Sequence, residues 1–317
     1  MPEVSGLVAS AFEERIREQE ELILSPLAVR SYAGRGRRRE GEECSLRTPF
    51  QRDRDRILHS KPFRRLKGKT QVFIDPAGDH YRTRMTHTLE TTGIARAVAR
   101  ALRLNEDLTE AIGLGHDMGH PPFGHAGEDE LDRCLIEHFG TGFRHNEQSH
   151  RIARELNLTA EVCDGILTHT GEGEPASLEG KVVRLVDRVA YINHDIDDAI
   201  RFGILDPGEL PREEIELLGA TGGRRIDALV HDLVESSERA GDVVQSDEVG
   251  EAMHSLRSFM FERVYLGRHA REEHERAHST VHRIFERLVE AGQGEREITD
   301  FISGMTDRFA LTYAETL

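Results

Sequence analysis

Apolar residues recur at intervals of three and four along nearly the whole chain, whereas alternation of apolar and polar residues is scarce. This spacing matches the 3.6-residue turn of an α-helix and predicts an all-α protein. The expected helices cover 7–24, 51–66, 83–103, 106–117, 127–139, 145–156, 158–169, 177–202, 224–239, 249–266, 270–291 and 295–314. At most one short strand or hairpin is expected, around 71–74, and loops are expected at 171–175 and 219–223.

No internal repeat and no clear linker interrupts this helical pattern. We therefore expect an N-terminal helix with a basic arm at 1–50, followed by one helical domain at 51–317 that includes a helical C-terminal extension. With 317 residues, the chain can bury a substantial core.

The composition narrows the class of protein. Charged residues make up 32% and hydrophobic residues 37%, which is too apolar for general disorder. No apolar run reaches the roughly 20 residues of a membrane span, and charged residues interrupt the N-terminus where a signal peptide needs an apolar stretch. We expect a cytoplasmic protein that does not enter a membrane. Three distant cysteines, Cys44, Cys134 and Cys163, are expected to be reduced thiols.

Positive charge gathers in one part of an acidic chain. The net charge is −16, yet residues 30–69 hold fourteen Arg/Lys against five Asp/Glu. Such a block indicates a local anion site, either a polyphosphate pocket or a nucleic-acid groove, or else a solvated arm. For 35–39 (RGRRR) we expect the solvated arm. Residues 52–69 interleave charges with apolar side chains, which favours a structured segment.

Two histidines fall on the apolar faces of neighbouring predicted helices. His87 shares the apolar stripe of its helix, and His116 follows Leu108 and Ile112 at intervals of four. Asp117 comes directly after His116, near the helix end. A single buried histidine is usually a core residue, but a buried carboxylate beside two of them is costly unless a cation neutralises it. The set therefore predicts a metal site.

A fourth ligand is expected from the long helix 177–202, which is apolar on several sides. Asp187, Tyr191, Asp195 and Asp198 form one polar stripe along it, at intervals of four, four and three. We interpret Asp187 as a ligand because its neighbours are apolar or Arg. Asp198 is expected on a solvated face.

The resulting donor set is two imidazoles and two carboxylates. Such a mixed set suits a divalent metal ion (Mn, Mg, Co, Ni, Fe or Zn) with positions left for water. A cation of this kind lowers the pKa of bound water and polarises a phosphoryl oxygen. Just downstream, the passage HDMGHPPFGHAGE offers His120, His125 and Glu128 for proton transfer.

Four long segments of the sequence indicate a particular protein family. The H…HD…D pattern resembles the HD superfamily of metal phosphohydrolases. The strings at 52–73, 78–90, 104–131 and 143–152, which include RDRDRILHSKPFRRLKGKTQVF and FRHNEQSHRI, closely resemble bacterial deoxyguanosine triphosphate triphosphohydrolase-like enzymes. This resemblance implies a mostly helical HD-domain fold at 51–317. It also implies hydrolysis of deoxynucleoside triphosphates (dGTP or several dNTPs) to deoxynucleoside and inorganic triphosphate.

Site residues carry over from the resemblance position by position. It assigns the metal to His87, His116, Asp117 and Asp187. His125 with Glu128 matches the family's catalytic His–acid pair, and His145 matches a further active-site histidine beside the candidate His120.

The same resemblance implies a substrate-binding set. Arg84 and Arg188 fall at phosphate-binding positions, and Gln71, Tyr191 and Asp195 fall around the deoxyribose. A tyrosine beneath the sugar would crowd a 2′-hydroxyl, which favours deoxy substrates.

Many members of the family assemble into tetramers or hexamers, so the resemblance implies a homo-oligomer. It also allows an allosteric dNTP or single-stranded DNA as an additional partner.

Two alternative functions stay open. One is an HD phosphodiesterase or pyrophosphohydrolase acting on another nucleotide. The other is a non-catalytic nucleotide- or nucleic-acid-binding regulator, which the basic block would suit.

Overall fold

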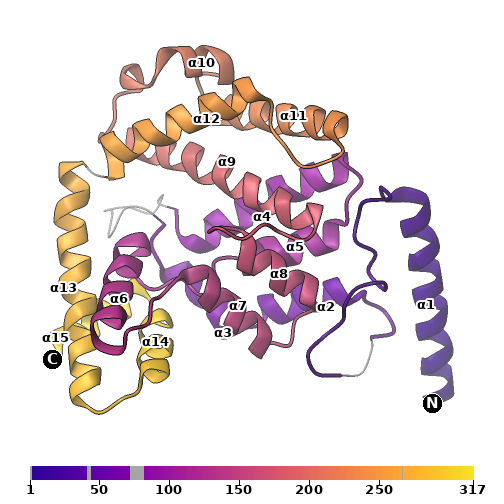
Figure 1. Cartoon of the computed structure of the whole chain (residues 1–317), viewed down its shortest axis with the longest axis horizontal. Coiled ribbons are helices and arrows are strands. Elements are labelled where there is room, and N and C mark those ends of the chain that lie inside the picture. The colour runs from indigo at the N-terminus through magenta and orange to yellow at the C-terminus, as the bar shows by residue number, and fades with distance from the viewer. Residues whose placement is uncertain (1, 41–43, 72–81, 266) are drawn as a thin grey trace.

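The computed structural model describes residues 2–40, 44–71, 82–265 and 267–317. Figure 1 shows the helices in their spatial order. Their bounds are α1 (Pro2–Ile23), α2 (Pro49–Leu58), α3 (Lys61–Arg65), α4 (Arg84–Ala101), α5 (Glu106–Gly115), α6 (Gly124–Phe139), α7 (His145–Glu155), α8 (Ala160–Thr168), α9 (Leu178–Arg201), α10 (Arg212–Leu218), α11 (Gly222–Ala240), α12 (Asp247–Met260), α13 (Arg268–Glu290), α14 (Glu295–Ser303) and α15 (Asp307–Glu315). Short 3₁₀ segments (Leu66–Gly68, Pro207–Glu209) and a π-helical turn (Phe261–Tyr265) complete the described elements.

The prediction of an all-α fold is confirmed. Within the described residues, β-structure is limited to two isolated antiparallel bridges, Arg37 with Thr159 and Thr70 with Thr83. The strand or hairpin expected at 71–74 falls almost entirely at residues 72–81, outside the described part of the chain. None of the described helices is both long and apolar enough to cross a membrane.

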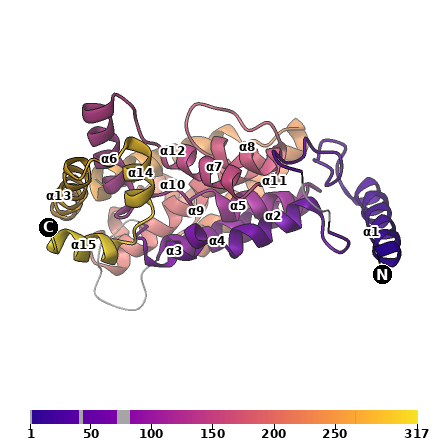
Figure 2. The same ribbon diagram turned by 90° about the horizontal axis from the view of Figure 1, so that it is seen from below.

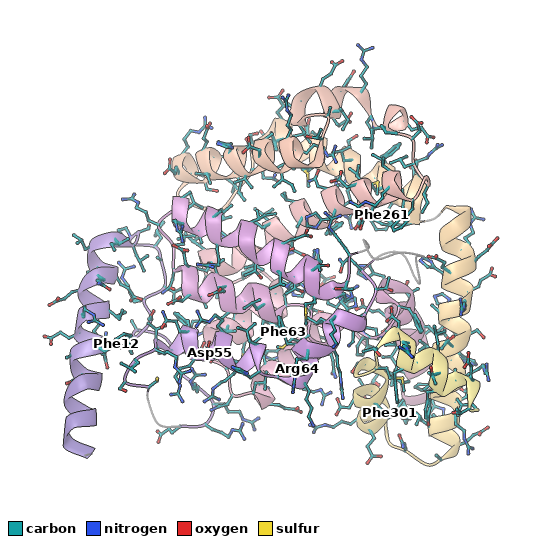
Figure 3. All side chains as sticks on the ribbon, turned by 180° about the vertical axis from the view of Figure 1, so that it is seen from behind. Phe12, Asp55, Phe63, Arg64, Phe261 and Phe301 are labelled. Atoms are coloured by element: carbon teal, nitrogen blue, oxygen red, sulfur yellow. The ribbon has the colours of Figure 1, made fainter. Side chains whose placement is uncertain are left out.

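Capping side chains explain where the predicted helix bounds were wrong. The segment 51–66 is two helices, because Ser60 accepts a hydrogen bond from Phe63 N and starts α3 anew. Within α3, Phe63 is buried and the adjacent Arg64 is exposed (Figure 3). The segment 295–314 is likewise divided at Gly304, after which Thr306 caps α15. The short α10 was not predicted.

Three apolar clusters organise these helices. The central cluster joins α2, α4, α5, α8 and the first half of α9. The second half of α9 packs under α10, α11 and α12. α9 therefore runs through the middle of the molecule, and polar side chains on its inward face, such as Asp187, lie between the helices of the central layer.

The third cluster joins α6 to α13, α14 and α15. Seen from below, these C-terminal helices lie at the opposite end of the molecule from α1 (Figure 2). α6 follows α5 directly in the chain, so the C-terminal helices pack against the segment that continues from His116 and Asp117.

Candidate metal centre and active site

Three packed helices bring the predicted ligands together. His87 lies in the second turn of α4, His116 is the C-cap residue of α5 with Asp117 next to it, and Asp187 lies near the middle of α9. These helices contact one another pairwise. The capping box of Thr83 fixes the start of α4, and with it the turn on which His87 stands.

The donor atoms of these residues face one another. His87 Nε2 lies 3.0 Å from Asp187 Oδ1, and His116 Nε2 lies 3.6 Å from both Asp187 Oδ1 and Asp117 Oδ2. His116 Nδ1 donates to Gly113 O at 2.6 Å, because a carbonyl only accepts, and this leaves the lone pair on Nε2.

This arrangement fits a cation. His116 Nε2 is buried and has no hydrogen-bond partner among the described residues, although His87 and Asp117 have donor atoms within 4.8 Å of it and Asp187 Oδ1 lies 3.6 Å away. An unpaired buried ring nitrogen beside two carboxylates is costly on its own, whereas a divalent cation would satisfy all of these groups. The chemistry of the site therefore suits a divalent metal, whose identity the donor set leaves open.

Both carboxylates are held in the charged form. Burial alone would raise the pKa of Asp187, but the hydrogen bond and charge of His87 lower it. The pKa of Asp117 is likewise lowered well below its ordinary value against the effect of burial, by His116 and Arg84. Deprotonated carboxylates are the form that binds a metal.

Arg84 adds a buried cation to the same site. Its side chain is 2% exposed and donates to Asp117 Oδ2 at 2.7 Å. The remaining nitrogens, Nε and Nη2, have no partner among the described residues. Gly124 lies beside this guanidinium, where a side chain would crowd it. A partly unsatisfied guanidinium next to a metal site is well placed to bind a phosphate oxygen.

The loop after Asp117 turns into α6 and forms a second cluster. Phe123 and Gly124 have positive φ angles of 65° and 59°, which turn the chain sharply into the helix. Glu128, in the second turn of α6, has its Oε2 3.3 Å from His125 Nδ1. The helix therefore begins earlier than predicted, at Gly124, and the His125–Glu128 pair is helical rather than part of a loop.

Glu128 also contacts His145, whose proton positions follow from its partners. Glu128 Oε1 lies 2.8 Å from His145 Nδ1, so Nδ1 carries a proton. His145 Nε2 lies 3.3 Å from His169 Nε2, and His169 already donates from Nδ1 to Ile166 O. The proton between the two rings therefore belongs to His145, which is doubly protonated. Although burial opposes this charge, Glu128 raises the pKa of His145.

His120 and His125 differ in their access to solvent. His120 is buried and stacks on the ring of His145, with centroids 4.0 Å apart, and burial together with Arg84 keeps the pKa of His120 well below its ordinary value. The His125 side chain is 75% exposed. Of the predicted proton-transfer residues, His125 is therefore the one that a substrate can reach from outside.

His169 belongs to this cluster and was not predicted. It is the C-cap of α8, and its Nδ1 bonds to the carbonyl three residues earlier, as that of His116 does at the end of α5. The rings of His116 and His169 lie 5.0 Å apart. The signal that identified His116, a histidine ending an apolar helix, would have identified His169 too.

The predicted sugar-binding residues occupy the next turns of α9. Tyr191 Oη accepts a hydrogen bond from Arg257 Nε at 2.9 Å, and Asp195 accepts one from the hydroxyl of Tyr265. Asp195 is buried, which raises its pKa to about 7. Neither Arg257 nor Tyr265 was predicted, because both come from the C-terminal third of the chain.

The remaining residues predicted from the sequence differ in their surroundings. Gln71 has a buried Oε1 without a partner among the described residues, whereas Arg188 is exposed. The expectation of a solvated Asp198 is wrong, because this residue is 6% exposed and pairs with Arg82 at 2.8 Å. A spacing pattern cannot reveal a partner that comes from another helix.

The C-terminal helices brace the active-site loop through two ionisable residues. The fully buried Lys69 donates to His120 O at 2.6 Å and to Ser303 O at 2.7 Å. Asp307 accepts hydrogen bonds from the backbone N–H groups of Thr70 and Phe123 at 2.8 and 3.0 Å. The end of α14 and the start of α15 thus fix the backbone on both sides of the candidate site.

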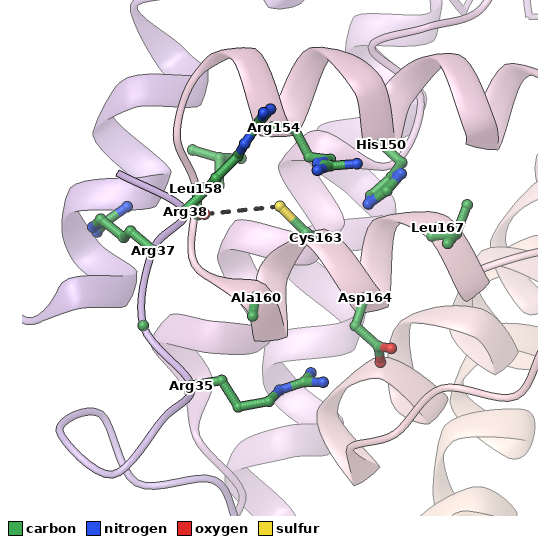
Figure 4. A pocket seen from close by; sticks show the side chains of 11 residues that line it. Arg35, Arg37, Arg38, His150, Arg154, Leu158, Ala160, Cys163, Asp164 and Leu167 are labelled. Atoms are coloured by element: carbon green, nitrogen blue, oxygen red, sulfur yellow. Dashed lines mark hydrogen bonds between the residues drawn. The ribbon is translucent and has the colours of Figure 1, made fainter. Parts of the chain in front are cut away.

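The basic arm is only partly solvated, which corrects the expectation for 35–39. Arg37 pairs with the fully buried Asp53 and donates to Asn157 O at 2.8 Å, so it anchors the arm to α2 and α8. The arm borders a cavity of about 380 Å³ shown in Figure 4. It is lined by Arg35, Gly36, Arg37, Arg38, His150, Arg154, Leu158, Ala160, Cys163, Asp164 and Leu167. The dashed line marks Cys163 Sγ donating to Leu158 O at 3.8 Å.

Comparison with known proteins assigns the central helices to a family. The model described as "HD domain" matches residues 84–192, which contain all four predicted ligands. A second model, "Phosphohydrolase-associated domain", matches 243–295.

Full-length relatives agree. A "Deoxyguanosinetriphosphate triphosphohydrolase-like protein" of Caldanaerobacter subterraneus subsp. tengcongensis is 52% identical, over 94% of this chain and 93% of the relative. Proteins of that name are 45% identical in Clostridium perfringens (93% of this chain, 94% of the relative) and 37% identical in Geobacter sulfurreducens (94% and 96%). A crystal structure of a hypothetical protein from Aquifex aeolicus aligns with a TM-score of 0.48 at 20% identity, covering 82% of this chain and 67% of that one, too weak a likeness to support a conclusion.

Proposed function

This chain belongs to the family of deoxyguanosinetriphosphate triphosphohydrolase-like proteins and carries an HD domain, and on this basis we propose that it hydrolyses deoxynucleoside triphosphates. The products are the deoxynucleoside and intact inorganic triphosphate. The coarser description, a phosphohydrolase of the HD type, follows from the family itself.

One observation supports the proposal more than any other. Three kinds of group meet at Asp117 and the loop that follows it. They are a set of side chains of the kinds that bind metals, a buried arginine with unpaired N–H groups, and a Glu–His pair whose histidine is exposed to solvent. These are the three parts that phosphate ester hydrolysis needs: a cation site, a second positive charge for the phosphates, and a proton donor for the leaving group.

Each residue has a proposed role. A divalent cation held by His87, His116, Asp117 and Asp187 would supply Lewis-acid polarisation of a phosphoryl oxygen. Arg84 binds a phosphate oxygen through the N–H groups that Asp117 leaves free.

The proposed proton-transfer group is the pair formed by His125 and Glu128 at the start of α6. Glu128 fixes the proton of His125 on Nδ1. As water attacks the α-phosphorus, the bond from phosphorus to O5′ breaks and His125, in its doubly protonated form, gives the Nε2 proton to O5′. The oxygen of the water stays on the released triphosphate and its proton passes to solvent, so the products are the deoxynucleoside and inorganic triphosphate, and His125 regains a proton from solvent. In this scheme the charged His145 holds Glu128 in place and deprotonated, and the neutral His120 stacks on the ring of His145.

Sugar selection is assigned to α9. Tyr191, one turn after Asp187, packs beneath the deoxyribose and crowds a 2′-hydroxyl, and Asp195 binds the 3′-hydroxyl. Gln71, with its buried Oε1, is also assigned to the deoxyribose, and the exposed Arg188 is assigned to the phosphates.

The test is a panel of the four dNTPs and GTP, offered singly and mixed, with Mg²⁺ or Mn²⁺. We expect tripolyphosphate and deoxynucleoside in equal amounts, and little product from GTP. Pyrophosphate or orthophosphate as the first product would instead establish the alternative HD phosphodiesterase or pyrophosphohydrolase activity.

The metal assignment is tested with Asp187→Ala. It should lose the metal of this site and turnover while staying folded. Asp227→Ala, which removes an exposed aspartate on α11, serves as the control and should keep both.

The arginine-lined cavity of Figure 4 is the observation that favours the regulator alternative. A regulator would bind nucleotides but release no product from any member of the panel, and Asp187→Ala would leave nucleotide binding at the arm unchanged.

A further inference from the structure

A second group of metal-binding side chains lies between α6 and α13. Glu130 and Cys134 stand one turn apart on the same face of α6, and His282 faces them from α13. Figure 1 shows the two helices side by side, and they pack directly against each other. None of the three belongs to the candidate active site.

The distances between the donor atoms are those of a tetrahedral zinc site. Cys134 Sγ lies 3.5 Å from His282 Nδ1 and 3.4 Å from Glu130 Oε1, and Glu130 Oε1 lies 3.2 Å from His282 Nδ1. With Zn–S about 2.3 Å and Zn–N and Zn–O about 2.1 Å, tetrahedral coordination separates sulfur from nitrogen or oxygen by about 3.6 Å, and oxygen from nitrogen by about 3.4 Å. The three donor atoms already have the spacing that the ion requires, and the group that must move to admit it is the guanidinium of Arg133, which contacts Glu130 and His282.

We propose that Glu130, Cys134 and His282 bind a divalent cation of the zinc class and thereby clamp α6 to α13. A thiolate, an imidazole and a carboxylate form a donor set that favours Zn²⁺ over Mg²⁺ or Ca²⁺, because the sulfur ligand is soft. On binding, the Cys134 thiol gives up its proton to solvent, and the thiolate charge is neutralised by the cation.

The surroundings of the triangle suit this site. Glu130 is 3% exposed and Cys134 is 2% exposed, while the His282 side chain is 43% exposed, which gives an ion a way in. Burial and the Glu130 charge raise the pKa of Cys134 to about 12, so without a cation the thiol stays protonated and donates to Glu130 Oε1. A cation would replace that weak hydrogen bond.

His278 is the candidate for the fourth ligand. It lies one turn before His282 on α13, and its Nε2 is buried without a partner among the described residues. Arg133 competes with a cation for Glu130, because it donates from Nη2 to Oε1 at 2.5 Å and from Nε to Oε2 at 3.1 Å, and its Nη2 also lies 3.5 Å from His282 Nδ1. Its side chain is half exposed and already contacts Glu137 at 3.0 Å, so it can turn toward Glu137 when an ion binds.

Cobalt distinguishes this site from the HD centre, because only this site contains sulfur. Metal-stripped wild-type protein reloaded with Co²⁺ should show a sulfur-to-cobalt charge-transfer band in the near ultraviolet. Neither Cys134→Ser nor His282→Ala should show this band when loaded with Co²⁺. After reloading with Zn²⁺, the wild-type protein should hold one more equivalent of zinc per chain than either variant. His278→Ala should shift the band if it supplies the fourth ligand.

Two controls fix the interpretation. Cys163→Ser removes another buried thiol and should keep the band and the metal content. Asp187→Ala should also keep the band, so the outcome is separate from that of the proposed hydrolase. His282 is partly exposed, so His282→Ala is expected to fold, and circular dichroism checks this. A wild-type protein without the band, with the same zinc content as Cys134→Ser and His282→Ala, would show that the three side chains are only hydrogen-bonded to one another.

Discussion

Glu128 accepts two hydrogen bonds from His145 through one oxygen, from the backbone N–H and from ring Nδ1, each at 2.8 Å. The second oxygen, Oε2, lies 3.0 Å from the same His145 Nδ1 and 3.3 Å from His125 Nδ1, so the two histidines share it. One carboxylate thus fixes the start of α7 and orients the exposed histidine at the start of α6. Its position depends on the buried, charged His145, which connects the proton donor to the core.

Glu128→Gln keeps the size of the side chain but removes the charge that orients His125. We expect turnover of dNTP to fall by a factor of about 10² to 10⁴, the range that positioned acid–base groups supply, with a small change in stability. Steady-state kinetics and thermal unfolding measure the two effects. The neighbouring Asp129→Asn, at an exposed position, is the matched control; equal activity in both variants would remove Glu128 from the mechanism.

Lys69→Met should destabilise the protein, because it leaves the carbonyls of His120 and Ser303 buried without a donor. Each unsatisfied group costs about 1–3 kcal/mol, partly offset by removal of a buried charge, so we expect a loss of about 2–4 kcal/mol in urea unfolding. Lys67→Met, at an exposed position in the same 3₁₀ turn, should have little effect. Equal stability of the two variants would mean that Lys69 does not brace the loop.

Gly119→Ala should displace α7. A Cβ at Gly119 would lie 2.3 Å from Ser149 N and 2.7 Å from His145 O, both of which are backbone atoms that cannot turn away. We expect a loss of about 3 kcal/mol and reduced turnover, because His145 moves with its helix. Gly93→Ala on α4 meets open space and should be neutral or stabilising by up to about 1 kcal/mol. Unfolding midpoints of the two variants decide between these outcomes.

The raised pKa of the buried Asp195 should make the free energy of unfolding depend on pH. Burial raises its pKa to about 7 from an ordinary value of 3.8, even though the Tyr265 hydroxyl favours the charged form. The folded state therefore binds more protons than the unfolded state between these values. The contribution of Asp195 to the free energy of unfolding is fully present below about pH 4, and it is lost as the pH rises through about 7.

Asp195→Asn should remove that loss. At pH 8 the variant should exceed wild type in free energy of unfolding by at most about 4 kcal/mol, and at pH 4 the difference should vanish. Tyr265→Phe should act in the opposite direction and steepen the decline. Urea unfolding at pH 4, 6 and 8 measures both, and a constant difference between Asp195→Asn and wild type at all three would contradict the raised pKa.

Helical periodicity was sufficient to predict the class of fold and the proximity of His87, His116, Asp117 and Asp187, because buried polar residues on apolar helix faces must find partners inside. It could not supply the partners that come from distant parts of the chain. Arg257, Tyr265 and Asp307 reach the site from helices whose own sequence pattern is that of ordinary amphipathic surface helices.

The basic arm shows the same limit. Its composition predicted a solvated segment, but Arg37 is inserted between α2 and α8 because Asp53 is buried there and needs a cation. Charge density alone does not tell a surface arginine from one that neutralises a hidden carboxylate.

The contacts of Ser303 and Asp307 with the loop beside the candidate site also bear on the order in which the protein folds. Ser303 and Asp307 lie 234 and 237 residues along the chain from Lys69 and Thr70, and Asp307 lies 184 residues from Phe123. Contacts of such high sequence separation close a long loop, so their entropic cost is met only after much of the helical core has formed. The backbone beside Asp117 should therefore take its final geometry late in folding, when α14 and α15 dock.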